Sequence, residues 1–302
     1  MKGKVPQIVQ YQGSKRLLAP QILEYMPHHF NKMIEPFAGM AAMTIALAQK
    51  RRADRYMLND LNSPLVKILV SAIETPNHLY EEYRKVWEEQ FSYREGSVAH
   101  YFNIREKFNA GEKSAANMLY LLARCVKGSV RYNSNGEFNQ SPDKRRYGTT
   151  PKNLMDNIFA ISYCLKGKTD FYSLDYQEIL DLAQPGDVVY MDPPYQGVSQ
   201  NRDARYISGV DFDEFVNAVD RLNNRGVDFL ISYDGSCGNK KYGRDMPESL
   251  GMKKVLLKAG LSSQQILLGQ KETTYEALYV SRGLMKFMPQ QQPSLFNQYL
   301  AI

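Results

Sequence analysis

Strand-like segments fall into two groups in this 302-residue chain, and a long stretch with a helical pattern separates them. The segments are residues 31–34, 55–58, 170–174, 187–191 and 228–232. A crossover between parallel strands normally needs only about a dozen residues. The stretch 75–165 is therefore too long for a single connection, and we interpret it as an inserted second domain.

The segments around the insertion alternate between strand and helix. After the first strand the chain turns at residues 35–39 and continues into strong helix formers at 40–50. The second strand ends at Asn59-Asp60, and a helix is expected to begin at Ser63-Pro64, with Ser63 as its cap. This alternation predicts an α/β fold with a doubly wound sheet.

A hairpin of residues 264–268 and 277–281 is expected to make that sheet mixed. The expected division has three parts: an α/β domain over 1–74 and 166–288, an inserted and mostly helical domain over 75–165, and a tail over 289–302.

The insertion contains three amphipathic patterns, at 80–91, 98–109 and 114–126, followed by a basic segment. Residues 124–152, called the basic loop below, hold seven Lys or Arg and two Asp or Glu. Tyr and Phe alternate there with Asn, Gly and Ser, which indicates a loop or hairpin. With a net charge of +6 and 12% aromatic residues, the chain suits a partner that carries phosphates and stackable rings.

Other classes of protein are disfavoured by composition. The three cysteines are far apart and odd in number, so reduced thiols are expected rather than disulfides. His28 and His29 are adjacent rather than at ligand spacing, so no metal site is expected. No apolar run approaches the roughly 18 residues of a membrane span, and the first residues lack the core of a secretion signal. We therefore expect a soluble, cytoplasmic protein.

The turn at residues 35–39 lies where a helix N-terminus receives a nucleotide-like ligand. Met40-Ala41-Ala42 stands where a dinucleotide fingerprint needs a second glycine, which disfavours a pyrophosphate cofactor. Asp60 follows the next strand, the usual place of a carboxylate that accepts hydrogen bonds from ribose hydroxyls. A helix cap is an equally good interpretation of Asp60.

The most specific motif is Asp192-Pro193-Pro194-Tyr195, directly after an apolar strand. An exocyclic amine is a poor nucleophile because its lone pair is delocalised into the ring. Asp192 and the carbonyl of Pro193 can each accept one amine hydrogen and so concentrate the lone pair toward a methyl donor. Tyr195 would stack on a base swung out of the duplex. The alternative is a proline-rich turn without chemistry.

Several motifs, in this order, resemble the Dam-type (D12 class, alpha-group) DNA adenine-N6 methyltransferases. They are Tyr11-Gln12-Gly13-Ser14-Lys15-Arg16, Glu35-Pro36-Phe37-Ala38-Gly39, Asn59-Asp60-Leu61-Asn62, residues 131–139, Asp175-Tyr176 and Asp192-Pro193-Pro194-Tyr195. The resemblance extends from Tyr11 to about Gly283. Its usual Phe-x-Gly-x-Gly turn has Ala41 in the last place here.

The resemblance implies S-adenosylmethionine as cofactor and assigns residues to it. Asp192, Pro193 and Tyr195 would be catalytic. The cofactor would be bound by Tyr11, Lys15, Glu35, Phe37, Gly39, Asp60, Asp175, Tyr176 and Asp192. The basic loop resembles the target-recognition region, whose expected DNA contacts are Arg131, Asn133, Lys144, Arg145 and Arg146. A solvated loop is the alternative for 144–146, and a turn for Asn133.

The function that follows is methylation of adenine N6 in a specific duplex DNA sequence, with base flipping. Methylation of a cytosine ring carbon is disfavoured because no cysteine follows a proline. An RNA adenine or DNA cytosine-N4 methyltransferase and a catalytically silent DNA-binding module remain open alternatives.

Two protein partners are also considered. A cognate restriction endonuclease is one possibility raised by the family. The segment 292–296 (Gln-Pro-Ser-Leu-Phe) resembles the pentapeptides that dock bacterial DNA-acting proteins on the replicative sliding clamp. Its alternative is a tail that folds back on the catalytic domain.

Overall fold

The computed structural model describes residues 4–194, 210–237, 240–241, 244–261 and 273–289. Its strands lie in one mixed sheet of order β3-β2-β1-β4-β5-β8-β7, to which the short β6 adds by pairing with β5. β1 to β5 run parallel along the path, whereas β8 is antiparallel to both β5 and β7. The strands are β1 (Phe30–Glu35), β2 (Ala53–Asn59), β3 (Thr169–Tyr172), β4 (Val188–Met191), β5 (Asp228–Cys237), β6 (Lys240–Lys241), β7 (Lys253–Leu261) and β8 (Thr273–Val280).

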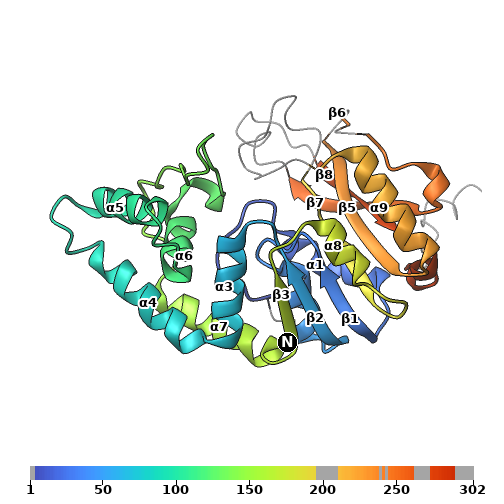
Figure 1. Cartoon of the computed structure of the whole chain (residues 1–302), viewed down its shortest axis with the longest axis horizontal. Helices are drawn as coiled ribbons and strands as arrows, with labels where there is room; N and C mark the ends of the chain where they lie inside the picture. The colour runs from blue at the N-terminus through green and yellow to red at the C-terminus, as the bar shows by residue number, and fades with distance from the viewer. Residues whose placement is uncertain (1–3, 195–209, 238–239, 242–243, 262–272, 290–302) are drawn as a thin grey trace, which may run out of the picture.

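Helices cover both faces of the sheet (Figure 1). The α-helices of the described residues are α1 (Ala19–Ile22), α2 (Ala42–Gln49), α3 (Ser63–Glu74), α4 (Pro76–Glu89), α5 (Ser97–Asn109), α6 (Ala115–Arg124), α7 (Pro151–Leu165), α8 (Tyr176–Asp181) and α9 (Phe212–Asn224). In Figure 1, α4, α5 and α6 extend away from the sheet. Because side chains alternate along a strand, Val188 and Tyr190 of β4 pack with α2, α3 and α7. Val189 and Met191 point to the other face and pack with α8 and α9. The prediction of a doubly wound mixed sheet is confirmed.

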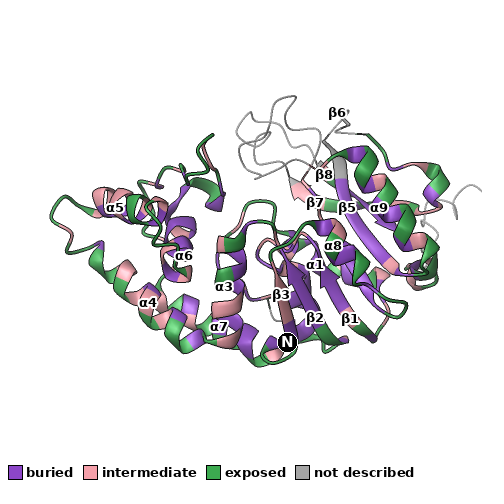
Figure 2. Ribbon diagram, in the orientation of Figure 1, coloured by how far each residue is buried: buried purple, intermediate pink, exposed green. Residues whose placement is uncertain are grey.

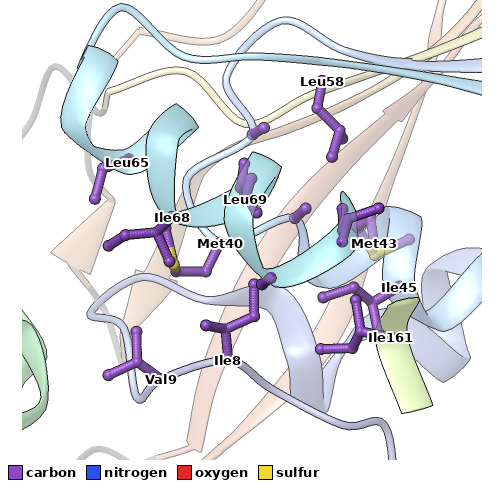
Figure 3. Packing of buried hydrophobic residues seen from close by; sticks show 14 of the residues in the cluster. Ile8, Val9, Met40, Met43, Ile45, Leu58, Leu65, Ile68, Leu69 and Ile161 are labelled. Carbon is purple, nitrogen blue, oxygen red and sulfur yellow. The ribbon is translucent and has the colours of Figure 1, made fainter. Parts of the chain in front are cut away.

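The predicted insertion, residues 75–165, is mostly helical, as expected, and contains α4 to α7 with no strand of its own. Its apolar side chains form one continuous cluster with those of α2, α3 and one sheet face. Figure 2 shows buried residues running from the sheet into this helical part. In Figure 3, Ile161 of α7 lies beside Met43 and Ile45 of α2, and Ile68 and Leu69 of α3 are in the same cluster.

The sequence-based interpretation was wrong or incomplete at three places. The helix α7 was not recognised, although Thr150 caps it through Asn153 N and Pro151 opens it. The cap residue of α3 is Asn62 rather than Ser63. The expected strand at 264–268 lies outside the described residues, and the described hairpin partner of β8 is β7.

The basic loop is largely irregular, as expected. Two isolated bridges, Cys125 with Pro142 and Tyr132 with Phe138, fold it back on itself. Gly128 has a φ of +59°, and a Cβ there would lie 2.1 Å from the carbonyl oxygen of Gln10. The loop therefore packs tightly on the N-terminal segment. No helix in the described part of the chain is long and apolar enough to cross a bilayer.

Candidate active site

A cavity of about 220 Å³ opens at the carboxyl ends of β1 to β4. β1 and β4 are the neighbours between which the strand order reverses, the place where open α/β sheets bind ligands. We call it the strand-end pocket. Its lining includes Tyr11, Lys15, Glu35, Phe37, Gly39, Asn59, Asp60, Asn62, Asp175, Tyr176, Tyr190, Asp192 and Pro194.

Every residue predicted for the cofactor lines this pocket, although the residues come from five separate segments. Among the predicted catalytic residues, Asp192 lines it too, and Pro193 is buried beside it. Tyr195 lies outside the described residues. The predicted DNA contacts are not part of the pocket lining.

The turn after β1 depends on left-handed backbone at Gly39 (φ +50°) and Ala41 (φ +53°). A Cβ on Gly39 would lie 3.0 Å from the ring of Tyr11, so glycine leaves room where the two segments meet. Ala41 adopts the same region with a side chain, at a cost of roughly 1–2 kcal/mol. Glu35 accepts the backbone N–H of Thr44 at 2.6 Å and so ties β1 to α2.

Asp60 stands between two backbone amides. Its carboxylate accepts the N–H of Gly39 at 2.9 Å and that of Asn62 at 2.9 Å. It therefore fixes the turn after β1 and the entry to α3, and it faces the pocket as well. The structural interpretation of Asp60 and the ligand-binding one are compatible, since each carboxylate oxygen can accept a further hydrogen bond.

Asn59 organises three of the strand ends, a role that we did not predict. Its side-chain amide donates to the carbonyls of Pro36 and Leu174, and its oxygen accepts the N–H of Leu174. The side chain is 1% exposed. A polar residue at the end of an apolar strand was the only signal for this role.

Aromatic rings form one wall of the pocket. The ring centroids of Phe37 and Tyr176 are 5.2 Å apart, and Phe215 of α9 packs behind both. The buried hydroxyl of Tyr176 has no hydrogen-bond partner within the part of the chain that the structure describes. Asp175, in contrast, is exposed and caps α8 by accepting the N–H of Gln177.

The pocket residues Lys15 and Asp192 form a largely buried ion-pair cluster with Glu276. The Nζ of Lys15 is 3.0 Å from Asp192 Oδ1 and 3.1 Å from Glu276 Oε1. Burial by itself would lower the pKa of Lys15, but the two carboxylates outweigh burial and raise this pKa well above its ordinary value. Glu276 was not predicted, because nothing in the sequence around it links β8 to the Asp-Pro-Pro motif.

Two further carboxyl groups in the pocket have perturbed acidities. Burial raises the pKa of Glu35 to about 7, an effect that the hydrogen bonds from Thr44 only partly offset. Burial also raises the pKa of Asp60 above its ordinary value, against the two backbone hydrogen bonds. The pocket thus gathers titratable groups whose charges are expensive to bury, as sites of chemistry do.

One contact joins the basic loop to the pocket. The hydroxyl of Tyr132 donates to Asn62 Oδ1 at 3.0 Å, and burial raises the pKa of Tyr132 to about 12. Asn62 in turn donates its backbone N–H to Asp60. A continuous set of hydrogen bonds therefore leads from the loop to the lining of the pocket.

The predicted DNA contacts differ in how they are engaged. Arg131, Lys144 and Arg145 are exposed. Arg146 is exposed but pairs with Asp143 at 2.8 Å and donates to Gln10 Oε1 at 3.2 Å. Asn133 uses both polar atoms of its side chain within the turn, toward Asn135 N, Glu137 N and Glu137 Oε2. The turn role of Asn133 is therefore observed, and its base-reading role stays a prediction.

The mixed sheet, with helices on both faces and a pocket at its strand ends, defines a doubly wound α/β protein with a ligand-binding site at its topological switch point. The family model described as "D12 class N6 adenine-specific DNA methyltransferase" matches residues 11–261. The chain belongs to this family and is an enzyme of adenine-specific DNA methylation. The resemblance seen in the motifs is confirmed.

Individual relatives agree with that assignment. The chain is 27% identical over 240 residues to the type II methyltransferase M1.LlaDCHI of Lactococcus lactis subsp. cremoris, covering 75% of this chain and 80% of that one. It is 25% identical over 275 residues to the type II methyltransferase M.MjaIII of Methanocaldococcus jannaschii, covering 84% and 92%. It is 26% identical to the DNA N-6-adenine-methyltransferase of Escherichia phage P1, where the match covers 76% of this chain but only 30% of the phage protein.

Proposed function

We propose that this enzyme transfers a methyl group from S-adenosylmethionine to the N6 amine of adenine in a specific duplex DNA sequence, after flipping the base into the pocket beside Asp192. The observation that carries the proposal is the convergence of the predicted cofactor residues and Asp192 on one strand-end pocket.

The residues present fit S-adenosylmethionine. Phe37 and Tyr176 offer aromatic surface for the adenine ring, and the unpartnered Tyr176 hydroxyl offers a polar contact. Asp60 would accept hydrogen bonds from the ribose hydroxyls. Gly39 has no side chain to crowd the turn, where a Cβ would lie 3.0 Å from the Tyr11 ring. When bound, the cofactor supplies an electrophilic methyl group on a sulfonium.

The residues of the chain would then act on the amine. Asp192 and the Pro193 carbonyl would each accept a hydrogen bond from one N–H of the amine, which concentrates the nitrogen lone pair. Lys15 would fix the position of the Asp192 carboxylate. These two acceptors would direct the nitrogen lone pair at the methyl group that the cofactor supplies, and the surplus amine proton would pass to water. Tyr195 would hold the flipped base by stacking worth roughly 1–3 kcal/mol.

The helical insertion over 75–165 would recognise DNA, and the remainder over 1–74 and 166–288 would carry out catalysis. Exposed Arg131, Lys144 and Arg145 support this division, since Lys and Arg contacts to phosphates supply most DNA affinity. The partner proposals, a cognate endonuclease and a clamp contact through 292–296, stay predictions, and 290–302 lie outside the described residues.

The proposal is tested by incubating the purified chain with methyl-labelled S-adenosylmethionine and matched duplex DNA or RNA, followed by nucleoside analysis. We expect N6-methyladenine from DNA. Labelled N4-methylcytosine, label in RNA alone, or DNA binding without transfer would each favour one of the alternatives.

Base flipping has its own test. Fluorescence of 2-aminopurine at the target position should rise on binding of the wild-type chain, and Tyr195→Ala should reduce that rise far more than Tyr195→Phe. Equal signals from wild type and Tyr195→Ala would contradict the role of Tyr195.

A further inference from the structure

Glu276 contacts the pocket residue Lys15 from a distant part of the chain. It lies on β8, which is separated from β4 by β5. Since Tyr190 pairs with Leu230, and Leu230 with Val280, alternation along β8 places Glu276 on the same sheet face as Tyr190. Lys15 bridges the two strands over this face, with its Nζ within 3.1 Å of each carboxylate.

The charges of this cluster do not cancel. One ammonium and two carboxylates leave a net charge of −1, and the three side chains are only 7%, 22% and 15% exposed at Lys15, Asp192 and Glu276. With Asp192 as its only carboxylate partner, the buried Lys15 would form a neutral pair, and its full positive charge would attract Asp192 alone. With two, the attraction is shared, so Asp192 stays a stronger acceptor for an amine hydrogen.

The second carboxylate also restrains geometry. A lysine side chain has many rotamers, and an ammonium held from two strands loses most of them. Asp192 follows the last residue of β4. Lys15 contacts both Asp192 and Glu276, and so connects Asp192 to β8. A carboxylate that must meet a substrate amine within a few tenths of an ångström gains from that restraint.

We propose that Glu276 is a positioning residue for methyl transfer, which acts through Lys15 to orient the Asp192 carboxylate and to share the Lys15 charge, so that Asp192 stays a strong hydrogen-bond acceptor. This inference rests on the proposed function. It predicts a loss at the chemical step rather than in binding, because Glu276 is not part of the pocket lining.

The test measures single-turnover methylation of duplex DNA by the full chain, together with dissociation constants for S-adenosylmethionine and DNA. Glu276→Gln keeps the size of the side chain, Glu276→Asp keeps its charge, and Glu248→Gln is the matched control at an exposed glutamate of η5 (Glu248–Leu250). We expect Glu276→Gln to lower the rate by about 10–100-fold with both dissociation constants within about threefold. Glu276→Asp should recover part of the rate.

A double-mutant cycle tests action through Lys15. In a Lys15→Met background, adding Glu276→Gln should change the rate by less than about twofold. Thermal unfolding of each variant shows whether it is folded. If Lys15→Met does not fold, the inference is decided by the rates and dissociation constants of Glu276→Gln and Glu276→Asp.

The inference is overturned if Glu276→Gln keeps the rate of Glu248→Gln, if its loss lies in binding or folding, or if Glu276→Asp recovers nothing. Failure of the proposed function looks different, because the wild-type chain itself would then form no N6-methyladenine.

Discussion

The strand-end pocket and the basic loop both contain many charged residues, but they hold them in opposite ways. In the pocket, Lys15 is 7% exposed and lies between two carboxylates, and Asp60 accepts two backbone amides. In the loop, Lys144 and Arg145 are exposed. A buried charge is fixed in one geometry and acts on a particular atom, whereas an exposed charge acts through a screened field. Substitutions in the pocket should therefore change the rate, and substitutions in the loop should change affinity and its dependence on salt.

The largest effect is expected at Asp192. Asp192→Ala should lower methyl transfer by at least about 100-fold while binding of cofactor and DNA stays within about tenfold, because the lost acceptor acts mainly in the transition state. Rapid-quench methylation and equilibrium titrations measure the two quantities. A variant that keeps more than a few per cent of the rate would show that Asp192 does not carry the chemistry.

The second effect concerns the basic loop. Replacing Lys144, Arg145 and Arg146 with Ala should weaken binding to all DNA sequences by about 10–100-fold and reduce the salt dependence by about two to three phosphate contacts. Because Arg146 pairs with Asp143, we expect the loss of two phosphate contacts rather than three.

A matched control is available at the opposite end of the sheet. Lys50, Lys166 and Lys168 are exposed and precede β2 and β3, whereas the pocket lies at the carboxyl ends of these strands. Their triple replacement should leave the salt dependence almost unchanged. An equal loss in both triple variants would mean that the loop contributes only through net charge.

The third effect is on stability and its pH dependence. The pKa of Glu35 is about 7 in the folded chain, above its ordinary value of 4.5. The folded state therefore binds this proton more tightly than the unfolded state, and stability falls as pH rises from about 4.5 through 7. Glu35→Gln should lose less stability than wild type between pH 5 and 8, by about 2–3 kcal/mol. Denaturant unfolding at several pH values measures the free energy of unfolding of both proteins. If it changes with pH in the same way in both, the raised pKa of Glu35 is refuted. Glu248→Gln serves as the control.

The smallest effect is expected where the two regions meet. Tyr132→Phe removes the donor to Asn62 and should weaken S-adenosylmethionine binding by about 2–10-fold, the worth of one hydrogen bond. Tyr147→Phe, in an exposed tyrosine of the same loop, is the control and should have no effect. If both variants bind the cofactor like wild type, the hydrogen bond joins the two regions without influencing the pocket.

Much of the pocket could be predicted from the sequence because its parts follow strands directly. The residues after neighbouring parallel strands meet at one edge of the sheet, and this position pointed to the turn at 35–39, to Asp60 and to Asp192. Phe37 and Tyr176 were assigned through the resemblance to the family motifs, and they line the same pocket. The same logic predicted the parallel strands and the helical insertion.

What could not be predicted depends on pairing between distant segments. Glu276 contacts the pocket residue Lys15 only because β8 lies antiparallel beside β5. The sequence analysis placed the partner strand of β8 at 264–268 rather than at β7. β7 begins Lys-Lys and carries a further lysine at Lys258, so its apolar pattern is weak. The turn role of Asn133 likewise depends on its hydrogen bonds with Glu137.

The central claim is that this chain methylates adenine N6 in duplex DNA through the pocket around Asp192. The most direct measurement is single-molecule sequencing of DNA from cells that express either the wild-type chain or Asp192→Ala in a background without other adenine methylation. We predict N6-methyladenine at one recurring sequence with the wild type and none with the variant. Unmodified adenines with the wild type, or the same methylated sites with both chains, would contradict the account.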